Sequence, residues 1–417
     1  MHQQNSIYQV FVRNYAKEQP FQALTADLHR IKAMGFDYVY LMPIHPISEV
    51  NRKGTLGSPY SISDYYGIDE HLGTLSDFQA FLEQAHDLGL KVLLDMVFNH
   101  TGGNHYYLAE HPDFYWRDEQ GELTYRVGDW SDIVDLDFTN KALHDELIEV
   151  LKYWAKLGVD GFRFDVASLI PMEFWLKARG VLDREYSHLL WAAESIDLNF
   201  HRYLLKQQIE VENVPALAQV FDAFYDYETW DILQQAFTSE TKLKQYAFLS
   251  NRQVLMQPQG TILWRFIENH DQDRIASLID EVETWLYFNI LSYGMAFVYQ
   301  GQEWGEAKRT SLFDLDLIEP RPGQFTGLIT QLNRLKKTMY QAPVIGYEMD
   351  LINGLWLTEI MTTADTYYLI LDPYQNKPES IAIPATKVMD LITNEEIELE
   401  AGRFVNPQRP LILKKLA

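Results

Sequence analysis

The sequence GFRFDVAS, residues 161–168, places two opposite charges in a run that otherwise has the apolar character of a buried strand. Phe162 and Phe164 alternate with Arg163 and Asp165, so a strand here would carry the guanidinium and the carboxylate on one face. Burying either charge costs free energy unless the charge is paired or used. A purely structural ion pair is one interpretation. We favour a second, in which this face points into a functional site.

Four segments of the chain combine an amphipathic helix pattern, a glycine and then a run of β-branched or aromatic residues. A glycine supplies the left-handed turn that ends a helix. Strands that alternate with helices of this length predict βα units in a mostly parallel sheet. The helix before the second segment is expected to begin with a capping box from Ser76 to Gln79. The four segments are residues 34–44, 88–98, 157–167 and 293–301.

Four further apolar runs have the length and composition of strands. Together with the four segments above they make eight, the number that a closed barrel of parallel strands requires. The sequence therefore predicts an α/β fold of the (β/α)8 TIM-barrel type. The additional runs are residues 7–12, 188–195, 218–224 and 261–268.

Two regions depart from the βα pattern. The first is rich in His, Tyr, Gly and Trp and is longer than a usual βα loop, so we expect a short inserted subdomain after the third strand. The second consists of short runs separated by turn residues, which predicts a C-terminal antiparallel β-sandwich domain. We assign residues 1–100 and 133–344 to the barrel, 101–132 to the inserted subdomain and 345–417 to the C-terminal domain.

Composition narrows the classes of function. The chain has 417 residues, 47% of them hydrophobic, which is enough for a large core. A net charge of −24 argues against binding to nucleic acid or to an anionic membrane. The absence of cysteine excludes disulfides, thiolate metal sites and a cysteine nucleophile. No targeting or membrane-spanning segment is apparent in the sequence, so we expect a soluble, cytoplasmic protein.

Polar residues gather at the expected carboxyl ends of four strands, where the active site of a parallel barrel lies. Taken singly, Asp95 also fits a role as an arginine partner, and His100 fits that of a loop histidine. Three carboxyl groups without a nucleotide-binding loop or an HExxH motif predict carboxylate chemistry, for example glycoside hydrolysis. The residues are Asp95 and His100 from the third strand, Arg163 and Asp165 from the fourth, Glu194 from the fifth, and His270 and Asp271 from the seventh.

Four stretches resemble the signature sequences of the α-amylase family, glycoside hydrolase family 13, in the family's order. Two more stretches agree, SPYSISDYYGID at 58–69 and VYQGQEWG at 298–305. The resemblance covers roughly residues 5 to 340 and extends to a C-terminal β domain. The four stretches are DMVFNH at 95–100, GFRFDVAS at 161–168, AAES at 192–195 and FIENHD at 266–271.

The resemblance implies a role for each residue at the strand ends. Asp165 would be the nucleophile and Glu194 the general acid and base, while Asp271 would bind sugar hydroxyls. Arg163 would keep Asp165 ionised, since a neighbouring cation lowers the pKa of a carboxylate. The remaining residues would bind substrate: His100 and His270 by hydrogen bonds, Tyr60 by stacking on the sugar, and Asp95 by bracing the site.

The family resemblance implies a retaining glycoside hydrolase that cleaves α-1,4-glucosidic bonds of maltooligosaccharides, dextrins or starch. Ser168 and Leu169 stand where many secreted α-amylases have a Lys-His pair, and Val166 is typical of members active on α-1,6 bonds. An α-1,6-glucosidase or neopullulanase-like activity, and a glucanotransferase, therefore stay open as alternatives. From a different class, a non-catalytic relative that acts as a binding module is a further alternative.

We expect no required cofactor. The family resemblance places a calcium site near Asn99 and Asp135, but few carboxylates are evident there, so the sequence leaves calcium open. The sequence also leaves open the oligomeric state and the choice between endo and exo action. The expected partner is an oligosaccharide or α-glucan substrate.

Overall fold

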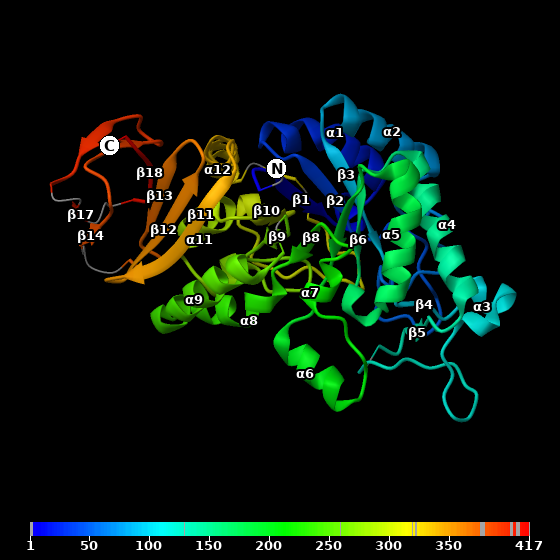
Figure 1. The fold of residues 1–417 in the computed structure, drawn as a ribbon. Coiled ribbons are helices and arrows are strands. Elements are labelled where there is room, and N and C mark those ends of the chain that lie inside the picture. Colours follow the sequence, from blue (N-terminus) through cyan, green and yellow to red (C-terminus); the bar gives the residue numbers. More distant parts are fainter. Residues whose placement is uncertain are drawn as a thin grey trace.

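Eight parallel strands form a closed barrel in the computed structural model of this chain (Figure 1). The structure describes residues 3–128, 130–258, 260–318, 320–321, 323–375, 380–400, 403–405 and 409–416. The order around the barrel is β1-β10-β9-β8-β7-β6-β3-β2. The strands are β1 (Ser6–Val10), β2 (Tyr38–Leu41), β3 (Lys91–Met96), β6 (Gly161–Phe164), β7 (Leu190–Ala193), β8 (Ala223–Tyr225), β9 (Ile262–Arg265) and β10 (Met295–Tyr299). The predicted (β/α)8 barrel is confirmed.

The predicted helix-glycine-strand units are present at all four positions. Gly35, Gly89, Gly158 and Gly294 have φ angles of 90°, 67°, 109° and 120°, in the left-handed region that glycine adopts without a steric penalty. At Gly294 a Cβ atom would also lie 2.4 Å from the carbonyl oxygen of Leu263, so a side chain would clash with the neighbouring strand. These glycines reverse the chain from each helix into the next strand.

The helices surround the barrel, and one predicted cap is placed two residues too late. The capping box consists of Thr74 and Asp77, not of Ser76 and Gln79, because the helix already begins at Leu75. The helices are α1 (Pro20–Ala33), α2 (Leu75–Asp87), α4 (Lys141–Leu157), α5 (Met172–Tyr186), α6 (Leu198–Lys206), α7 (Val214–Leu217), α8 (Tyr227–Ala236), α9 (Glu240–Met256), α10 (Ile275–Leu278), α11 (Val282–Leu291) and α12 (Thr326–Met339).

The strand expected at residues 218–224 is also displaced. It begins only at Ala223 and ends at Tyr225, because the short helix α7 and a turn occupy the preceding residues. The Asn213 side chain caps this helix by accepting a hydrogen bond from the backbone N–H of Ala216. The apolar residues of the turn are buried without being in a strand, which is why the apolar run alone misplaced the strand.

Two smaller parts accompany the barrel. Between β3 and β6 the chain forms β4 (His100–Gly102), α3 (Tyr107–Glu110) and β5 (Ile133–Asp135), with β4 and β5 paired antiparallel. After the barrel follow an antiparallel six-stranded sheet and a two-stranded sheet, which lie to one side of the barrel in Figure 1. Their strands are β11 (Val344–Ile352), β12 (Leu355–Thr362), β13 (Thr366–Leu371), β14 (Ser380–Ala382), β15 (Lys387–Asp390), β16 (Glu396–Glu398), β17 (Arg403–Val405) and β18 (Leu411–Lys415).

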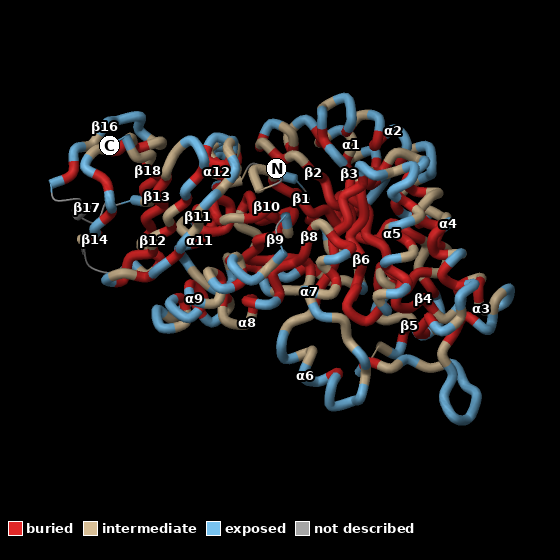
Figure 2. The backbone as a smooth tube through the Cα atoms, in the orientation of Figure 1, coloured by how far each residue is buried: buried red, intermediate tan, exposed pale blue. Residues whose placement is uncertain are grey.

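The barrel strands form the centre of the core and are buried except for Lys91 at the start of β3, whereas much of α6 is exposed (Figure 2). Helix α6 and the segment that carries β4 and β5 project on the same side of the barrel (Figure 1). Within the part of the chain that the structure describes, no helix is both long and apolar enough to cross a membrane. Since α6 follows β7 and the segment with β4 and β5 follows β3, the carboxyl ends of the barrel strands open between α6 and that segment.

Candidate active site

Arg163 is the buried centre of the site. Strands β3 and β6 pair in a register that sets Asp95 beside Arg163, and the Nη1 atom lies 2.7 Å from Asp95 Oδ1. The Asp95 carboxylate also accepts a hydrogen bond from Tyr40, at 2.6 Å. Both side chains of the Arg163–Asp95 pair are almost fully buried, and a buried ion pair needs such additional hydrogen bonds to offset its desolvation.

Arg163 also holds the carboxyl groups of Asp165 and Glu194. Its Nη1 atom lies 2.9 Å from Asp165 Oδ1, and its Nη2 atom lies 2.8 Å from Glu194 Oε2. Burial raises the pKa of Asp165 to about 7 and that of Glu194 to about 8, and the attraction of Arg163 only partly opposes this. The negative charges of Asp95 and Asp271 raise the pKa of Asp165 further.

Arg163 lowers the pKa of Asp165, as expected, but it does not determine the net direction of the shift. The guanidinium does favour the ionised form, but it is shared among three carboxyl groups. Burial and carboxylate repulsion together outweigh its effect on Asp165. Arg163 balances only part of the negative charge that Asp165 and Glu194 would carry together. The pair therefore retains a proton to higher pH than isolated carboxyl groups do.

His270 connects Asp271 to Tyr60 and to β1. The side-chain amide of Gln9 donates to His270 Nδ1 at 2.8 Å, so Nε2 carries the hydrogen. This Nε2 atom lies 3.0 Å from Asp271 Oδ2 and 2.7 Å from the Tyr60 hydroxyl, which in turn donates to Asp95 at 3.1 Å. Burial acts to raise the pKa of Asp271, but the contact with His270 and the charges of Arg163 and Arg309 together outweigh it, and the pKa is lowered.

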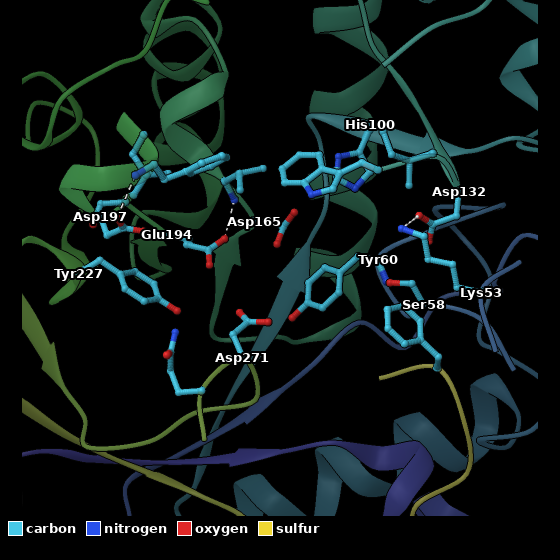
Figure 3. A pocket seen from close by; sticks show the side chains of 18 residues that line it. Lys53, Ser58, Tyr60, His100, Asp132, Asp165, Glu194, Asp197, Tyr227 and Asp271 are labelled. Atoms are coloured by element: carbon cyan, nitrogen blue, oxygen red, sulfur yellow. Dashed lines mark hydrogen bonds and ion pairs between the residues drawn. The ribbon is translucent and has the colours of Figure 1, made fainter. Parts of the chain in front are cut away.

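A cavity of about 360 Å³ lies over these groups, within the size range of small-molecule sites. Figure 3 shows the carboxyl groups of Asp165, Glu194 and Asp271 facing one another across it. Five of the eight predicted site residues line the cavity: Asp165, Glu194, Asp271, Tyr60 and His100. The other three, Asp95, Arg163 and His270, are buried behind them and contact them directly. The structure thus brings all eight together.

The sequence matches the family model described as "Alpha amylase, catalytic domain" over residues 20–120 and 111–342. It is 36% identical to an α-amylase from Lactobacillus plantarum whose crystal structure superposes with a TM-score of 0.93 over 99% of both chains. The chain belongs to the α-amylase family. The family resemblance predicted from the four sequence motifs at the strand ends is therefore confirmed.

Two further relatives extend the comparison within the α-amylase family. AmyB from Thermotoga neapolitana, described as a noncanonic maltogenic α-amylase, is 31% identical, with a TM-score of 0.87 over 100% of this chain and 99% of that one. The α-amylase MalA of Haloarcula japonica is 26% identical over 93% of this chain. The alignment spans 58% of the length of the Haloarcula protein.

Val166, directly after Asp165, has a backbone conformation unusual for a β-branched residue. Its φ and ψ angles of 36° and 44° lie in the left-handed region, which costs of order 1–3 kcal/mol. The conformation lets its backbone N–H donate to Glu194 Oε2 at 2.8 Å, so the turn links the two carboxyl-bearing strands. No local sequence signal indicates this conformation, because valine disfavours it.

Several cavity residues of this α-amylase family member were not predicted from its sequence. Tyr227 lies at the start of α8, and Phe200 lies on α6, where it contacts Trp130 of the inserted segment. Lys53 and Asp132 come from two loops and form an ion pair of 2.9 Å. The position of Asp132 near the end of an aromatic-rich segment was a weak sequence signal for a role in the site. Its ion pair with Lys53 has no sequence signal, because the two residues are distant in sequence.

An arginine lies beside Asp135, where the family resemblance places a calcium site. Arg126 donates to Asp135 Oδ2 from Nε at 2.9 Å and thus supplies the neighbouring positive charge. Asn99 Oδ1 and Asp135 Oδ1 are buried without a hydrogen-bond partner among the described residues, and calcium there would need further oxygen ligands from the backbone or water. Among the described residues no group of three or more His, Cys, Asp or Glu side chains could hold a metal ion. No step proposed below uses a metal.

Proposed function

We propose that this α-amylase family member is a retaining glycosidase that cleaves α-1,4-glucosidic bonds of maltooligosaccharides, dextrins or starch by double displacement. One observation carries the proposal. Two carboxyl groups with raised pKa values contact the two terminal nitrogens of one buried guanidinium, at the floor of a cavity of ligand size. Two carboxyl groups so held are close neighbours, as the nucleophile and the acid of a retaining enzyme must be.

The contacts of the two carboxyl groups support the division of roles. Asp165 and Glu194 share one guanidinium and burial raises the pKa of both, so the pair can hold one proton, and the family resemblance assigns that proton to Glu194. In the first step the Asp165 carboxylate attacks the anomeric carbon, the glycosidic bond breaks, and Glu194 gives its proton to the departing oxygen. In the second step Glu194 takes a proton from water, whose oxygen attacks the anomeric carbon and releases Asp165.

The remaining residues bind and orient the sugar in this proposal. Asp271 keeps a lowered pKa and is 37% exposed toward the cavity, so it accepts hydrogen bonds from sugar hydroxyls. His100 adds a hydrogen bond, and His270, whose ring nitrogens contact Gln9, Asp271 and Tyr60, orients the last two residues toward the sugar. Tyr60 offers its ring to the sugar while its hydroxyl contacts Asp95. Asp95 acts through its partners, because it is fully buried.

The proposed substrates are α-glucans, and the proposed products are short oligosaccharides. The description of the Thermotoga relative as maltogenic supports maltose as one product. The net charge of −24 opposes binding of nucleic acid, and the proposed steps require no cofactor. An α-1,6-glucosidase and a glucanotransferase are the alternatives within the family, since the same three carboxyl groups serve them all.

A product profile separates these activities. We expect turnover of maltoheptaose to maltose and glucose, and little turnover of isomaltotriose, because the proposal assigns the site to α-1,4 bonds. Faster cleavage of isomaltotriose or panose would favour the α-1,6 alternative, and products longer than maltoheptaose would favour transfer to sugar acceptors. A folded protein without turnover of any of these substrates would be a binding module instead.

The stereochemistry of the product is a further prediction. Two successive displacements at the anomeric carbon restore its configuration, so the first product should be the α-anomer. Proton NMR spectra recorded during the first minutes of maltoheptaose hydrolysis distinguish the anomers before they equilibrate. Initial appearance of the β-anomer would contradict a nucleophilic role for Asp165.

A further inference from the structure

Three loops meet at one end of the cavity and close it with an ion pair. Lys53 lies in the loop after β2, Asp132 lies at the end of the inserted segment, and their side chains meet at 2.9 Å between Nζ and Oδ1. Asp132 is only 7% exposed and Lys53 is 34% exposed, so the pair reaches from the cavity wall to its rim. Phe313, from the loop after β10, lines the same cavity.

Backbone contacts hold these loops together. The N–H of Leu56 donates to the carbonyl oxygen of Phe313 at 2.9 Å, and Thr55 donates to Asp314 from its backbone and from its hydroxyl. On the other side of the ion pair, the Ser61 hydroxyl donates to the backbone oxygen of Asp132 at 2.7 Å. The loops that carry Lys53 and Asp132 are therefore each held by hydrogen bonds, and the ion pair between them forms a wall at this end of the cavity.

The wall lies on the side of the cavity opposite to Glu194. Figure 3 shows Glu194 with Asp197 to the left of Asp165, and Lys53 with Asp132 to the right, joined by a dashed line. No such bridge closes the Glu194 end among the described lining residues. Asp197 there accepts hydrogen bonds from the first turn of its own helix, α6.

A glucan has a defined direction across this cavity. Asp165 attacks the anomeric carbon at the bond that breaks, and Glu194 protonates the oxygen of the departing part. The departing part, which carries the reducing end, thus lies on the Glu194 side. The part that carries the nonreducing end extends toward Lys53 and Asp132, where the ion pair and Phe313 stand in its path.

We propose that the Lys53–Asp132 ion pair ends the glycone side of the cleft and makes the enzyme exo-acting from free nonreducing chain ends. A chain that continues beyond the wall would have to break a pair in which one carboxylate is buried, and this would leave an uncompensated charge. The wall also sets how many sugars fit before the scissile bond, so products of one length are released. This inference rests on the proposed glycosidase function.

The test compares two maltoheptaosides, one free and one with a benzylidene acetal on its nonreducing-end glucose. We expect kcat/KM for the blocked substrate to be lower by at least about 100-fold, because exclusion by a wall discriminates more than a missing contact does. Chromatography of the free substrate should show one released length and the correspondingly shortened remainder in the first turnovers. Equal cleavage of both substrates would overturn the exo inference and leave the glycosidase function intact. Cleavage of neither would contradict the glycosidase function itself, and the inference with it.

Variants connect the effect to the ion pair. Lys53→Ala should open the wall and raise the ratio of blocked to free kcat/KM at least tenfold, which corresponds to about 1.4 kcal/mol of lost discrimination. Lys177→Ala is a matched control, since Lys177 pairs with Asp145 on the outer helices at 2.6 Å and both side chains are exposed. A Lys53→Ala protein with an unchanged melting temperature and the wild-type ratio would refute the role of the pair.

Discussion

Replacement of Asp165 by asparagine should lower kcat by roughly 10⁴-fold or more, on the scale seen when a catalytic nucleophile is removed. Replacement of Glu194 by glutamine should cost about 10²- to 10⁴-fold, the usual contribution of general acid–base catalysis. Both groups contact the same guanidinium at the cavity floor. Steady-state kinetics on maltoheptaose measure both effects.

Neither change should unfold the protein. Burial raises the pKa of both carboxyl groups, so a neutral amide of the same shape removes a desolvation cost, while Arg163 keeps Asp95 as a partner. Asp145→Asn, on the surface of α4, is the control and should keep the wild-type kcat. A folded Asp165→Asn protein with near wild-type turnover would refute the proposed nucleophile.

Replacement of Arg163 by methionine should destabilise the protein and abolish activity. The change leaves Asp95, Asp165 and Glu194 buried without their shared cation. Removal of one partner from a buried ion pair costs about 3–5 kcal/mol in the free energy of unfolding. Urea unfolding at about pH 8 should show this loss.

The loss of stability caused by Arg163→Met should depend on pH. The folded-state pKa values of Asp165 and Glu194, about 7 and about 8, lie above the ordinary values of 3.8 and 4.5. Their contribution to stability is therefore fully present below about pH 4 and is lost as the pH rises through 7 to 8. Without Arg163 both pKa values rise further, so the loss caused by Arg163→Met should be smaller at about pH 5 than at about pH 8.

Arg179→Met provides the matched control. Arg179 pairs with Asp183 and Asp222 nearer the surface, and its side chain is 21% exposed. Its replacement should cost about 1 kcal/mol or less. An Arg163→Met protein as stable as wild type at about pH 8 would contradict the central role of this guanidinium.

Much of the barrel is determined by local sequence. Gly35, Gly89, Gly158 and Gly294 mark helix ends through a backbone conformation that other residues disfavour. The apolar runs after them are short and rich in β-branched and aromatic residues, which favours buried strands. Since the carboxyl ends of parallel barrel strands share one face, the positions of Asp165 and Glu194 in the sequence already predict that they meet.

Where local signals compete, the sequence predicts less well. The run at residues 218–224 is apolar because it packs against the core, yet Asn213 caps a short helix just before it and delays the strand to Ala223. The helix cap at Thr74 instead of Ser76 reflects the same competition, because both hydroxyls precede an amphipathic pattern. Burial is visible in the sequence, whereas the backbone conformation of a buried turn is not.

The sequence by itself determined which side chains stand at the strand ends, because alternation and glycine signals act over a few residues. Only the tertiary structure decided their electrostatics. The pKa of Asp165 depends on burial and on Asp95, Asp271 and Arg163 together, which come from three different strands and loops. The Lys53–Asp132 wall likewise joins two loops that are distant in sequence. Coulomb interactions and desolvation depend on distances in space, and these distances exist only once the barrel has closed.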